Sequence, residues 1–201
     1  VTYEHEYILV FRKGGKRMFS GKSKQLRQES AYFWEERNVW FSDLWEIKGT
    51  TQIISKPTVS RNRSASFPFE VPYRLVNMYS IKGDTVLDPF CGLGTTNLAC
   101  IASERNSIGI EICPEIATLA QRSIAGQING LNKLIEKRLS AHLAFIESLT
   151  AEKQEKCYQN GFHGFAVKTR QETALQIKSI LNIDLQSEGL VCHYKENSAV
   201  R

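Results

Sequence analysis

The residues best suited to chemistry lie at positions 85–96, which read TVLDPFCGLGTT. A short apolar run ends there at Asp88 and is followed by two glycines, Gly92 and Gly94, with one residue between them. We expect a strand and then a turn whose missing Cβ atoms let a ligand lie close to the backbone. The helix predicted to begin near Thr95 directs its free N–H groups toward the same place. The stretch therefore predicts a binding loop at the end of a strand.

A carboxylate about twenty residues further on completes the pattern. Glu111 lies near the end of the apolar run NSIGIEI at residues 106–112, which predicts a second strand. A carboxylate in that position can accept two hydrogen bonds from the diol of a ribose. Pro114 then begins a helix that extends to about residue 128. This order of elements is that of a βαβ unit, so we expect an α/β fold whose parallel sheet is flanked by helices.

The residues around the glycines distinguish between classes of nucleoside cofactor. A dinucleotide-binding loop usually reads GxGxxG, but Asn97 stands where the third glycine would be. A phosphate-binding loop of the GxxxxGK[ST] type needs a lysine, and none follows Gly94. S-adenosylmethionine carries a nucleoside but no phosphate, and we favour it for that reason. A tight turn that binds nothing is the alternative, because short glycine motifs occur widely.

Composition restricts the classes of protein to be considered. The chain has 201 residues, of which 42% are hydrophobic and 23% charged, as in a globular domain with or without an appendage. No apolar run approaches the ~20 residues of a membrane span and no signal peptide opens the sequence, so we expect a cytoplasmic protein. The five cysteines are odd in number and lack CxxC spacing, which predicts free thiols and no metal site.

A basic segment, residues 12–27, lies near the beginning of the chain. It contains no acidic residue and seven basic ones, namely Arg12, Lys13, Lys16, Arg17, Lys22, Lys24 and Arg27. Residues 3–11 predict a strand before a tight turn at Gly14-Gly15, and aromatic residues follow at 32–34, 40–41 and 45. Basic and aromatic side chains together can neutralise phosphates and stack on bases. A solvated surface whose aromatic residues pack in the core is the alternative.

The rest of the chain is predicted from composition and spacing. Residues 50–66 indicate a loop, and Pro72 suits the first turn of a helix. Four patterns follow the βαβ unit: helical spacing at 131–149 and at 171–183, a loop at 157–165 and a strand at 189–194. We expect His142 and His163 to be ordinary core or surface histidines rather than ligands.

The run of motifs resembles one enzyme family. The stretch DPFCGLGTT, preceded by FPFEVPYRLVNMYSIKGDTVLD and followed by RNSIGIEI, is similar to the DNA amino-methyltransferases that modify cytosine N4 or adenine N6, in the permuted order called class beta. In that family a strand-rich segment like HEYILVFRKGGK and an element like DLWEI precede the FP-containing helix, as they do here. The resemblance covers about residues 3–125. It implies a Rossmann-like methyltransferase fold, S-adenosylmethionine as cofactor and duplex DNA as partner.

The resemblance also assigns roles to individual residues. Asp88 would orient the loop and the methionine amino group, and Glu111 would bind the ribose hydroxyls. Ile112 would lie against the adenine, while Thr95 and Thr96 would hold the methionine carboxylate. Ten residues form the predicted cofactor site: Phe67, Phe69, Asp88, Phe90, Gly92, Gly94, Thr95, Thr96, Glu111 and Ile112. The basic segment would belong to the DNA-recognition surface.

One motif of the family is missing from the sequence. The family carries a Ser/Asp/Asn-Pro-Pro-Tyr/Phe/Trp motif that aligns the target amine with the sulfonium methyl while the aromatic ring stacks on the flipped base. The five prolines here are never adjacent: Pro57, Pro68, Pro72, Pro89 and Pro114. In class beta the motif precedes the strand predicted at residues 3–11. We therefore expect the C-terminal part of an enzyme, truncated or encoded apart from its catalytic half, and assign no catalytic residue.

These observations predict how the chain is organised and what it does. Residues 1–129 would form a partial methyltransferase domain, incomplete at the N-terminus, with a target-recognition region at 12–48 and a cofactor core at 64–129. Residues 130–201 would form a helical extension of unknown role. The predicted reaction is methyl transfer from S-adenosylmethionine to an exocyclic amine of cytosine or adenine in specific DNA, in a restriction-modification context. The alternatives are a non-catalytic or degenerate subunit that binds both ligands, a nicotinamide-dependent oxidoreductase, and RNA as substrate.

Overall fold

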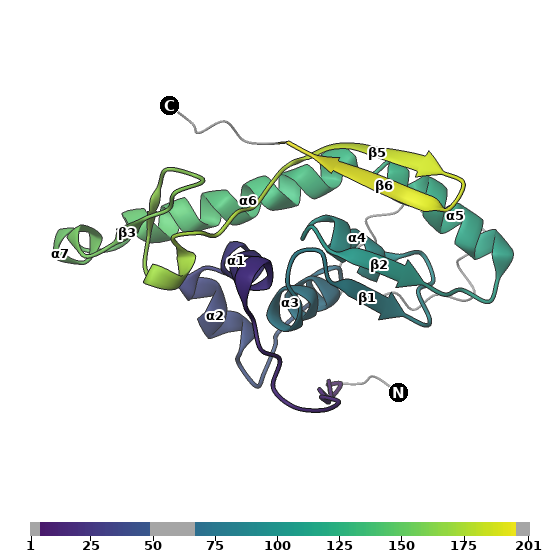
Figure 1. Cartoon of the computed structure of the whole chain (residues 1–201), viewed down its shortest axis with the longest axis horizontal. Coiled ribbons are helices and arrows are strands. Elements are labelled where there is room, and N and C mark those ends of the chain that lie inside the picture. Colours follow the sequence, from purple (N-terminus) through teal and green to yellow (C-terminus); the bar gives the residue numbers. More distant parts are fainter. Residues whose placement is uncertain (1–4, 49–66, 196–201) are drawn as a thin grey trace.

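A computed structural model describes residues 5–48 and 67–195 of the chain (Figure 1). Three helices come first: α1 Gly21–Glu29, α2 Trp34–Trp40 and α3 Glu70–Tyr79. They are followed by strand β1 Thr85–Asp88, helix α4 Thr95–Ile101, strand β2 Asn106–Gly109 and helix α5 Pro114–Ala125. The long helix α6 Ile128–Glu147 then runs across the molecule above α1, α2 and α3 in the view of Figure 1.

The βαβ unit predicted from the sequence is present. β1 and β2 are parallel neighbours, with Leu87 opposite Ile108 in the register. On one side of the pair, Val86 packs against a buried cluster that α3 and α4 provide, Val76, Ala99 and Cys100. The helices predicted at Pro72 and Pro114 are confirmed as α3 and α5. The part of the sheet that the structure describes therefore has helices on one face.

The strand predicted at residues 3–11 is wrong for the part that the structure describes. Residues 5–13 have no regular structure, and Tyr7, Leu9 and Phe11 are 83%, 73% and 85% exposed. A strand is stable only when a neighbouring strand satisfies its N–H and C=O groups, and none of the described strands pairs with this segment. The loop predicted at residues 50–66 lies outside the described residues.

The described part of the C-terminal extension, residues 130–195, mixes helix and strand and is not wholly helical as predicted. α6 confirms the helical spacing at residues 131–149. After it come α7 Ala151–Glu155, the paired strands β3 Tyr158–Gln159 and β4 Ala166–Val167, the 3-10 helix η2 Arg170–Glu172, and the antiparallel hairpin of β5 Ile180–Gln186 and β6 Gly189–Tyr194. β6 confirms the strand predicted at residues 189–194.

The helix predicted over residues 171–183 is wrong. The chain makes one turn at η2 and is then extended into β5. Leu175 and Ile177 are both buried, and Gln176 between them donates its N–H to the carbonyl oxygen of Glu29 at 3.1 Å. Asn132 of α6 bonds both the N–H and the C=O of Ile180, at 2.8 and 2.9 Å. These contacts with distant residues satisfy an extended backbone that a helix would have satisfied internally.

One hydrophobic core joins the N-terminal helices, the βαβ unit and the C-terminal extension. Phe33 from the N-terminal part, Leu98 of α4, Leu131 and Ile135 of α6, and Leu175 lie in the same buried cluster. The extension therefore packs against both the βαβ unit and the N-terminal helices. Among the described residues, no helix has the length and apolar character needed to cross a membrane.

Arg138 of α6 lies at the centre of this junction. Its side chain is 9% exposed and donates to the two carboxylate oxygens of Glu36 at 2.6 and 2.8 Å, and to the hydroxyl of Tyr73 at 3.1 Å. Burial, the largest single effect, would lower the pKa of Arg138, but the charges and hydrogen bonds of Glu36 and Tyr73 together outweigh it and raise the pKa. Because Glu36 belongs to α2 and Tyr73 to α3, one buried cation joins three helices.

His142 lies one turn further along α6 and is buried in the core. Its Nδ1 is 2.7 Å from Oε1 of Glu35, and its Nε2 is 3.0 Å from the carbonyl oxygen of Ala166. The imidazole stacks on Phe33, with ring centroids 3.8 Å apart. Both ring nitrogens contact oxygen atoms of the protein, and its burial confirms His142 as a core histidine.

Replacing Arg138 by alanine should destabilise the chain strongly. The variant leaves the 14%-exposed carboxylate of Glu36 without its partner, and breaking a buried ion pair in this way costs about 3–5 kcal/mol. Lys137→Ala is the matched control, because Lys137 is the adjacent, exposed basic residue and should change stability by less than about 0.5 kcal/mol. Urea denaturation followed by circular dichroism compares the two. Equal midpoints would contradict the role given to Arg138.

Candidate cofactor-binding site and basic segment

The predicted binding loop lies at the carboxyl end of β1. Asp88 ends the strand, and its Oδ1 accepts the N–H of Phe90 at 3.0 Å. Cys91 donates its N–H to the carbonyl oxygen of Ile110 at 2.9 Å, which fastens the loop to the segment after β2. The loop therefore has a defined position at the carboxyl edge of the sheet, where α/β folds bind their ligands.

Gly92 and Gly94 both have positive φ angles, 52° and 81°. A Cβ at Gly94 would lie 2.7 Å from Cδ1 of Ile124 in α5, so a larger residue would have to displace the end of that side chain as well as adopt a positive φ. A Cβ at Gly92 would meet nothing within 4 Å. The requirement for glycine there is conformational, and the space beside it is where the sequence predicts a ligand.

Glu111 connects the carboxyl ends of the two strands. Its Oε2 accepts the N–H of Gly92 at 3.1 Å, and its Oε1 accepts the N–H of Cys113 at 2.9 Å. Each carboxylate oxygen has two lone pairs, so both can still accept a hydrogen bond from a diol. The carboxylate thus orients the glycine loop and can still accept the hydrogen bonds of a ribose diol, as the sequence predicts.

Asn97 and Gly109 are site residues whose role the sequence did not reveal. Asn97 donates from Nδ2 to Oγ of Ser107 at 3.0 Å and so ties α4 to β2. A Cβ at Gly109 would lie 2.8 Å from Sγ of Cys91 and 3.0 Å from Oδ1 of Asn97. In GxGxxG loops the third glycine lets the helix pack closely on the strand. Here Gly109, at the end of β2, permits the close packing of β2 against Asn97 of α4. A glycine inside a strand was the signal that could have found it.

The other predicted cofactor residues differ in exposure and in their distance along the chain from the glycine loop. Phe90 and Ile112 are 88% and 96% exposed beside the loop. Phe69 instead stacks on Tyr73, with centroids 5.3 Å apart, and packs where α3 meets α4. Phe67, 47% exposed, comes just before α3. The carboxyl edge of the sheet gathers Asp88, Phe90, Gly92, Gly94, Thr95, Thr96, Glu111 and Ile112.

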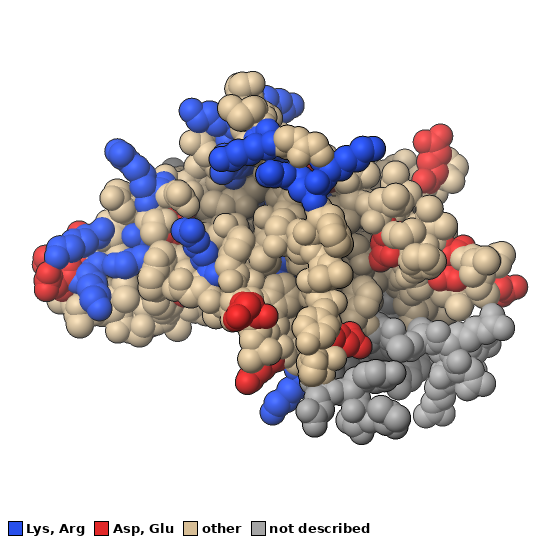
Figure 2. All heavy atoms as spheres, turned by 90° about the horizontal axis from the view of Figure 1, so that it is seen from below, with Lys and Arg blue, Asp and Glu red and all other residues tan. Residues whose placement is uncertain are grey.

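The basic segment is exposed and is fastened to the βαβ unit by one ion pair. Arg17 donates to both carboxylate oxygens of Asp84 at 2.6 and 3.0 Å, just before β1. Partial burial acts to raise the pKa of Asp84, but hydrogen bonds from Arg17 and from the N–H of Ile81 lower it. Figure 2 shows Lys and Arg side chains gathered along the upper edge of the molecule seen from below. The other six residues predicted to bind DNA are exposed: Arg12, Lys13, Lys16, Lys22, Lys24 and Arg27.

The aromatic residues after the basic segment divide between core and surface. Phe33 and Trp40 are buried, as the alternative interpretation of a packed core expects. Trp45 donates from its indole to the carbonyl oxygen of Trp40 at 3.0 Å. Trp34 is 39% exposed and stacks on Phe145 of α6. The aromatic residues therefore serve mainly to pack this region against the rest of the chain.

The glycine loop, Glu111 and the parallel strands form the constellation that the sequence attributed to DNA amino-methyltransferases. A family model described as DNA methylase matches residues 1–122. The chain belongs to this DNA methylase family. Membership confirms the resemblance drawn from the sequence. Together with the parallel β1–β2 pair and its helices, it also confirms the predicted Rossmann-like methyltransferase fold class.

Relatives of this chain include two type II methyltransferases. The chain is 46% identical over 179 residues to M.MthZI of Methanothermobacter thermautotrophicus, covering 88% of this chain and 49% of that one. It is 52% identical over 124 residues to M.MjaI of Methanocaldococcus jannaschii, covering 62% and 40%. TTHA0409 of Thermus thermophilus, a putative DNA modification methylase solved in complex with S-adenosyl-L-methionine, is 32% identical with a TM-score of 0.43, covering 57% and 40%. The chain spans about half or less of these relatives' lengths.

Gly94→Ala should destabilise the loop, whereas Gly126→Ala should not. Alanine at position 94 would adopt a left-handed conformation, at about 1–2 kcal/mol, and would also press on Ile124. Gly126, at the end of α5, has a φ of −83°, and its Cβ would lie 3.6 Å from the nearest atom, so alanine should be neutral or stabilise by about 0.4–1 kcal/mol. Thermal unfolding compares the two. A Gly94→Ala protein as stable as Gly126→Ala would refute this account of the loop.

Proposed function

We propose that this chain forms the cofactor-binding part of a methyltransferase that transfers a methyl group from S-adenosylmethionine to the N4 amine of cytosine or the N6 amine of adenine in specific duplex DNA. Glu111 is the observation that carries the proposal. Its carboxylate follows the second parallel strand, as a ribose-binding acid does, and also fastens Gly92. Family membership supports DNA as the substrate. The names of the type II relatives support a restriction-modification context.

The exposed side chains around the loop suit a nucleoside rather than a polyphosphate. Phe90, in the glycine loop, and Ile112, next to Glu111, offer exposed apolar surface, and covering such surface favours binding. Thr95 and Thr96 begin α4, where the positive end of the helix dipole attracts a carboxylate. No lysine follows Gly94 to neutralise a phosphate. This set of groups favours methyl transfer over the hydride transfer of a nicotinamide enzyme.

The bound cofactor supplies a methyl group already activated as a sulfonium, so the protein has to contribute orientation rather than a metal. Orientation of the target amine in this family depends on two adjacent prolines, and the five prolines of this sequence are all separated. We therefore propose that a further polypeptide portion, in the same or in a separate chain, carries the Pro-Pro motif. This chain would bind the cofactor and contact DNA.

The outer face of the β1–β2 pair supports such a portion. Leu87 and Ile108 are opposite each other in the register, and Ile110 follows two residues later, so that the three side chains share one face. They are 58%, 55% and 52% exposed. Parallel sheets are nearly always covered on both faces because their strands are apolar on both. We propose that the remaining part of the methyltransferase fold covers this face.

Titration calorimetry with S-adenosylmethionine tests the cofactor site. The wild-type chain should bind it saturably, and Glu111→Ala should bind at least about tenfold more weakly, a loss of ~1.4 kcal/mol or more, because two hydrogen bonds to a charged group disappear. Glu136→Ala, which removes an exposed carboxylate from α6, is the control and should bind as wild type does. Thermal unfolding verifies that both variants are folded. Undiminished binding by Glu111→Ala would remove the proposed ribose contact.

Co-expression tests the covering of the sheet. The chain, tagged, is produced together with the part of M.MthZI that lies outside their matched region, and we expect the two to purify as one complex. A Leu87→Asp/Ile108→Asp protein should not retain the second polypeptide, because the charges would be buried without partners. Leu181→Asp, on exposed β5, is the control and should retain it. Equal retention by both variants would show that the complex forms elsewhere.

A further inference from the structure

The C-terminal extension holds η2 against α1 and the start of α2. Glu172 of η2 is 1% exposed, and it accepts the backbone N–H of Trp34 at 2.7 Å and the hydroxyl and N–H of Thr169 at 2.5 Å each. η2 contacts α1 directly. The position of η2 beside the basic segment is therefore determined by buried hydrogen bonds.

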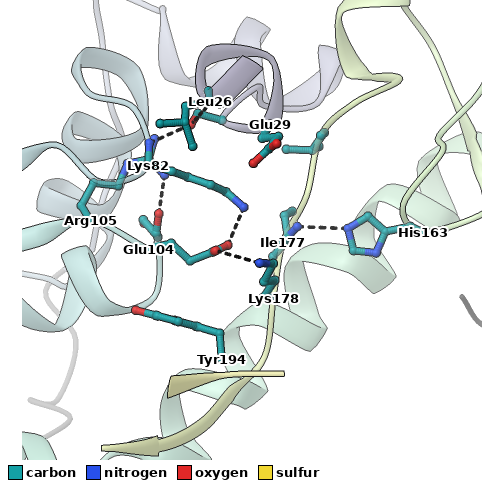
Figure 3. Close-up of polar contacts among 12 residues, drawn as sticks. Leu26, Glu29, Lys82, Glu104, Arg105, His163, Ile177, Lys178 and Tyr194 are labelled. Atoms are coloured by element: carbon teal, nitrogen blue, oxygen red, sulfur yellow. Dashed lines mark hydrogen bonds and ion pairs between the residues drawn. The ribbon is translucent and has the colours of Figure 1, made fainter. Parts of the chain in front are cut away.

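The segment between η2 and β5, residues 173–179, makes polar contacts with two different parts of the chain. As Figure 3 shows, the N–H of Ile177 donates to Nε2 of His163, at 3.1 Å. Burial, with the nearby charges of Lys82 and Arg138, lowers the pKa of His163 to about 4, so the ring is neutral at pH 7 and can accept this bond. On the other side, Glu104 lies 2.5 Å from Nζ of Lys82 and 3.7 Å from Nζ of Lys178. The extension is thus attached to the βαβ unit next to α1.

The acidic residues of α1 and η2 are buried or half-buried, whereas their basic residues are exposed. Glu172 is buried, and Glu29 at the end of α1 is half-buried, with its Oε1 accepting a hydrogen bond from Gln25 at 2.8 Å. The exposed charged side chains of the two elements are all basic: Lys22, Lys24 and Arg27 on α1, and Arg170 on η2. Lys168, just before η2, is half-buried. Two contacting elements that are far apart in the sequence therefore expose basic side chains and no fully exposed acidic one.

We infer that α1 and residues 168–170 form one phosphate-binding surface for duplex DNA, called the α1–η2 surface. A helix of nine residues is about 13 Å long, so α1 alone reaches few phosphates, and the extension widens its reach. Contacts of this kind position the duplex without reading its sequence. The inference rests on the proposed function for the identity of the ligand. It assigns to the extension a role in DNA binding.

The test is the salt dependence of DNA binding. Each phosphate contact contributes about 0.9 to the slope of log affinity against log salt, so Lys168→Ala/Arg170→Ala should reduce the slope by up to ~1.8 and Arg170→Ala by ~0.9. Fluorescence anisotropy with a duplex of about 30 base pairs, at several salt concentrations, measures the slope. The reduction should be equal for two duplexes of unrelated sequence. Arg170 is exposed, so the single variant should fold even if the double variant does not.

The matched control is Lys153→Ala/Lys156→Ala, which removes the same charge from the region of α7 in the same extension, where Lys156 is paired with Glu152. It should leave the slope unchanged. An unchanged slope for Arg170→Ala, a slope reduced as much by the control, or no DNA binding by the wild-type chain would each overturn the inference. Titration with S-adenosylmethionine separates this outcome from failure of the proposed function, because none of these variants touches the cofactor loop.

Discussion

The guanidinium of Arg138 is enclosed by three helices and neutralised by the carboxylate of Glu36, which comes from the other end of the chain. A buried cation is tolerated only while its partner is in place, so α6 determines where α2 lies. Tyr73 brings α3, and with it the βαβ unit, into the same contact. The contacts between η2 and the N-terminal helices depend on this arrangement, because they require α2 to lie beside the extension.

The strand β1 connects the two proposed binding regions. Before its amino end, Asp84 holds Arg17 of the basic segment, and at its carboxyl end Asp88 begins the cofactor loop. Four residues of strand span about 13 Å. Asp84 is ionised at neutral pH, so its ion pair with Arg17 is present there, and the lowered pKa of Asp84 extends the pair to more acidic pH. In the proposed enzyme, a short element of the βαβ unit would therefore set the separation between the DNA-binding segment and the methyl donor.

Among the described residues, two groups of cations differ in their surroundings. Lys82, Arg105 and Arg138 are buried and hold elements together. Burial lowers the pKa of Lys82, and it lowers that of Arg105 to about 10, so these side chains depend on fixed oxygen partners. The exposed cations of α1 and η2 form no ion pair with another described residue, and in the inferred surface they would contact phosphates. The modest net charge of +5 therefore conceals a local concentration of positive charge.

The sequence by itself determined the βαβ unit and the glycine loop, and it placed Glu111 just after the second strand. Positive φ at glycine, helix starts at proline and the alternation of short strands are properties of neighbouring residues, so they can be inferred locally. Only the tertiary structure decided that residues 5–11 lack a strand, that residues 173–179 extend from η2 to β5, and that Arg138 meets Glu36, 102 positions away. Strand pairing and the burial of charge depend on partners that are remote in sequence, and local spacing contains no record of them.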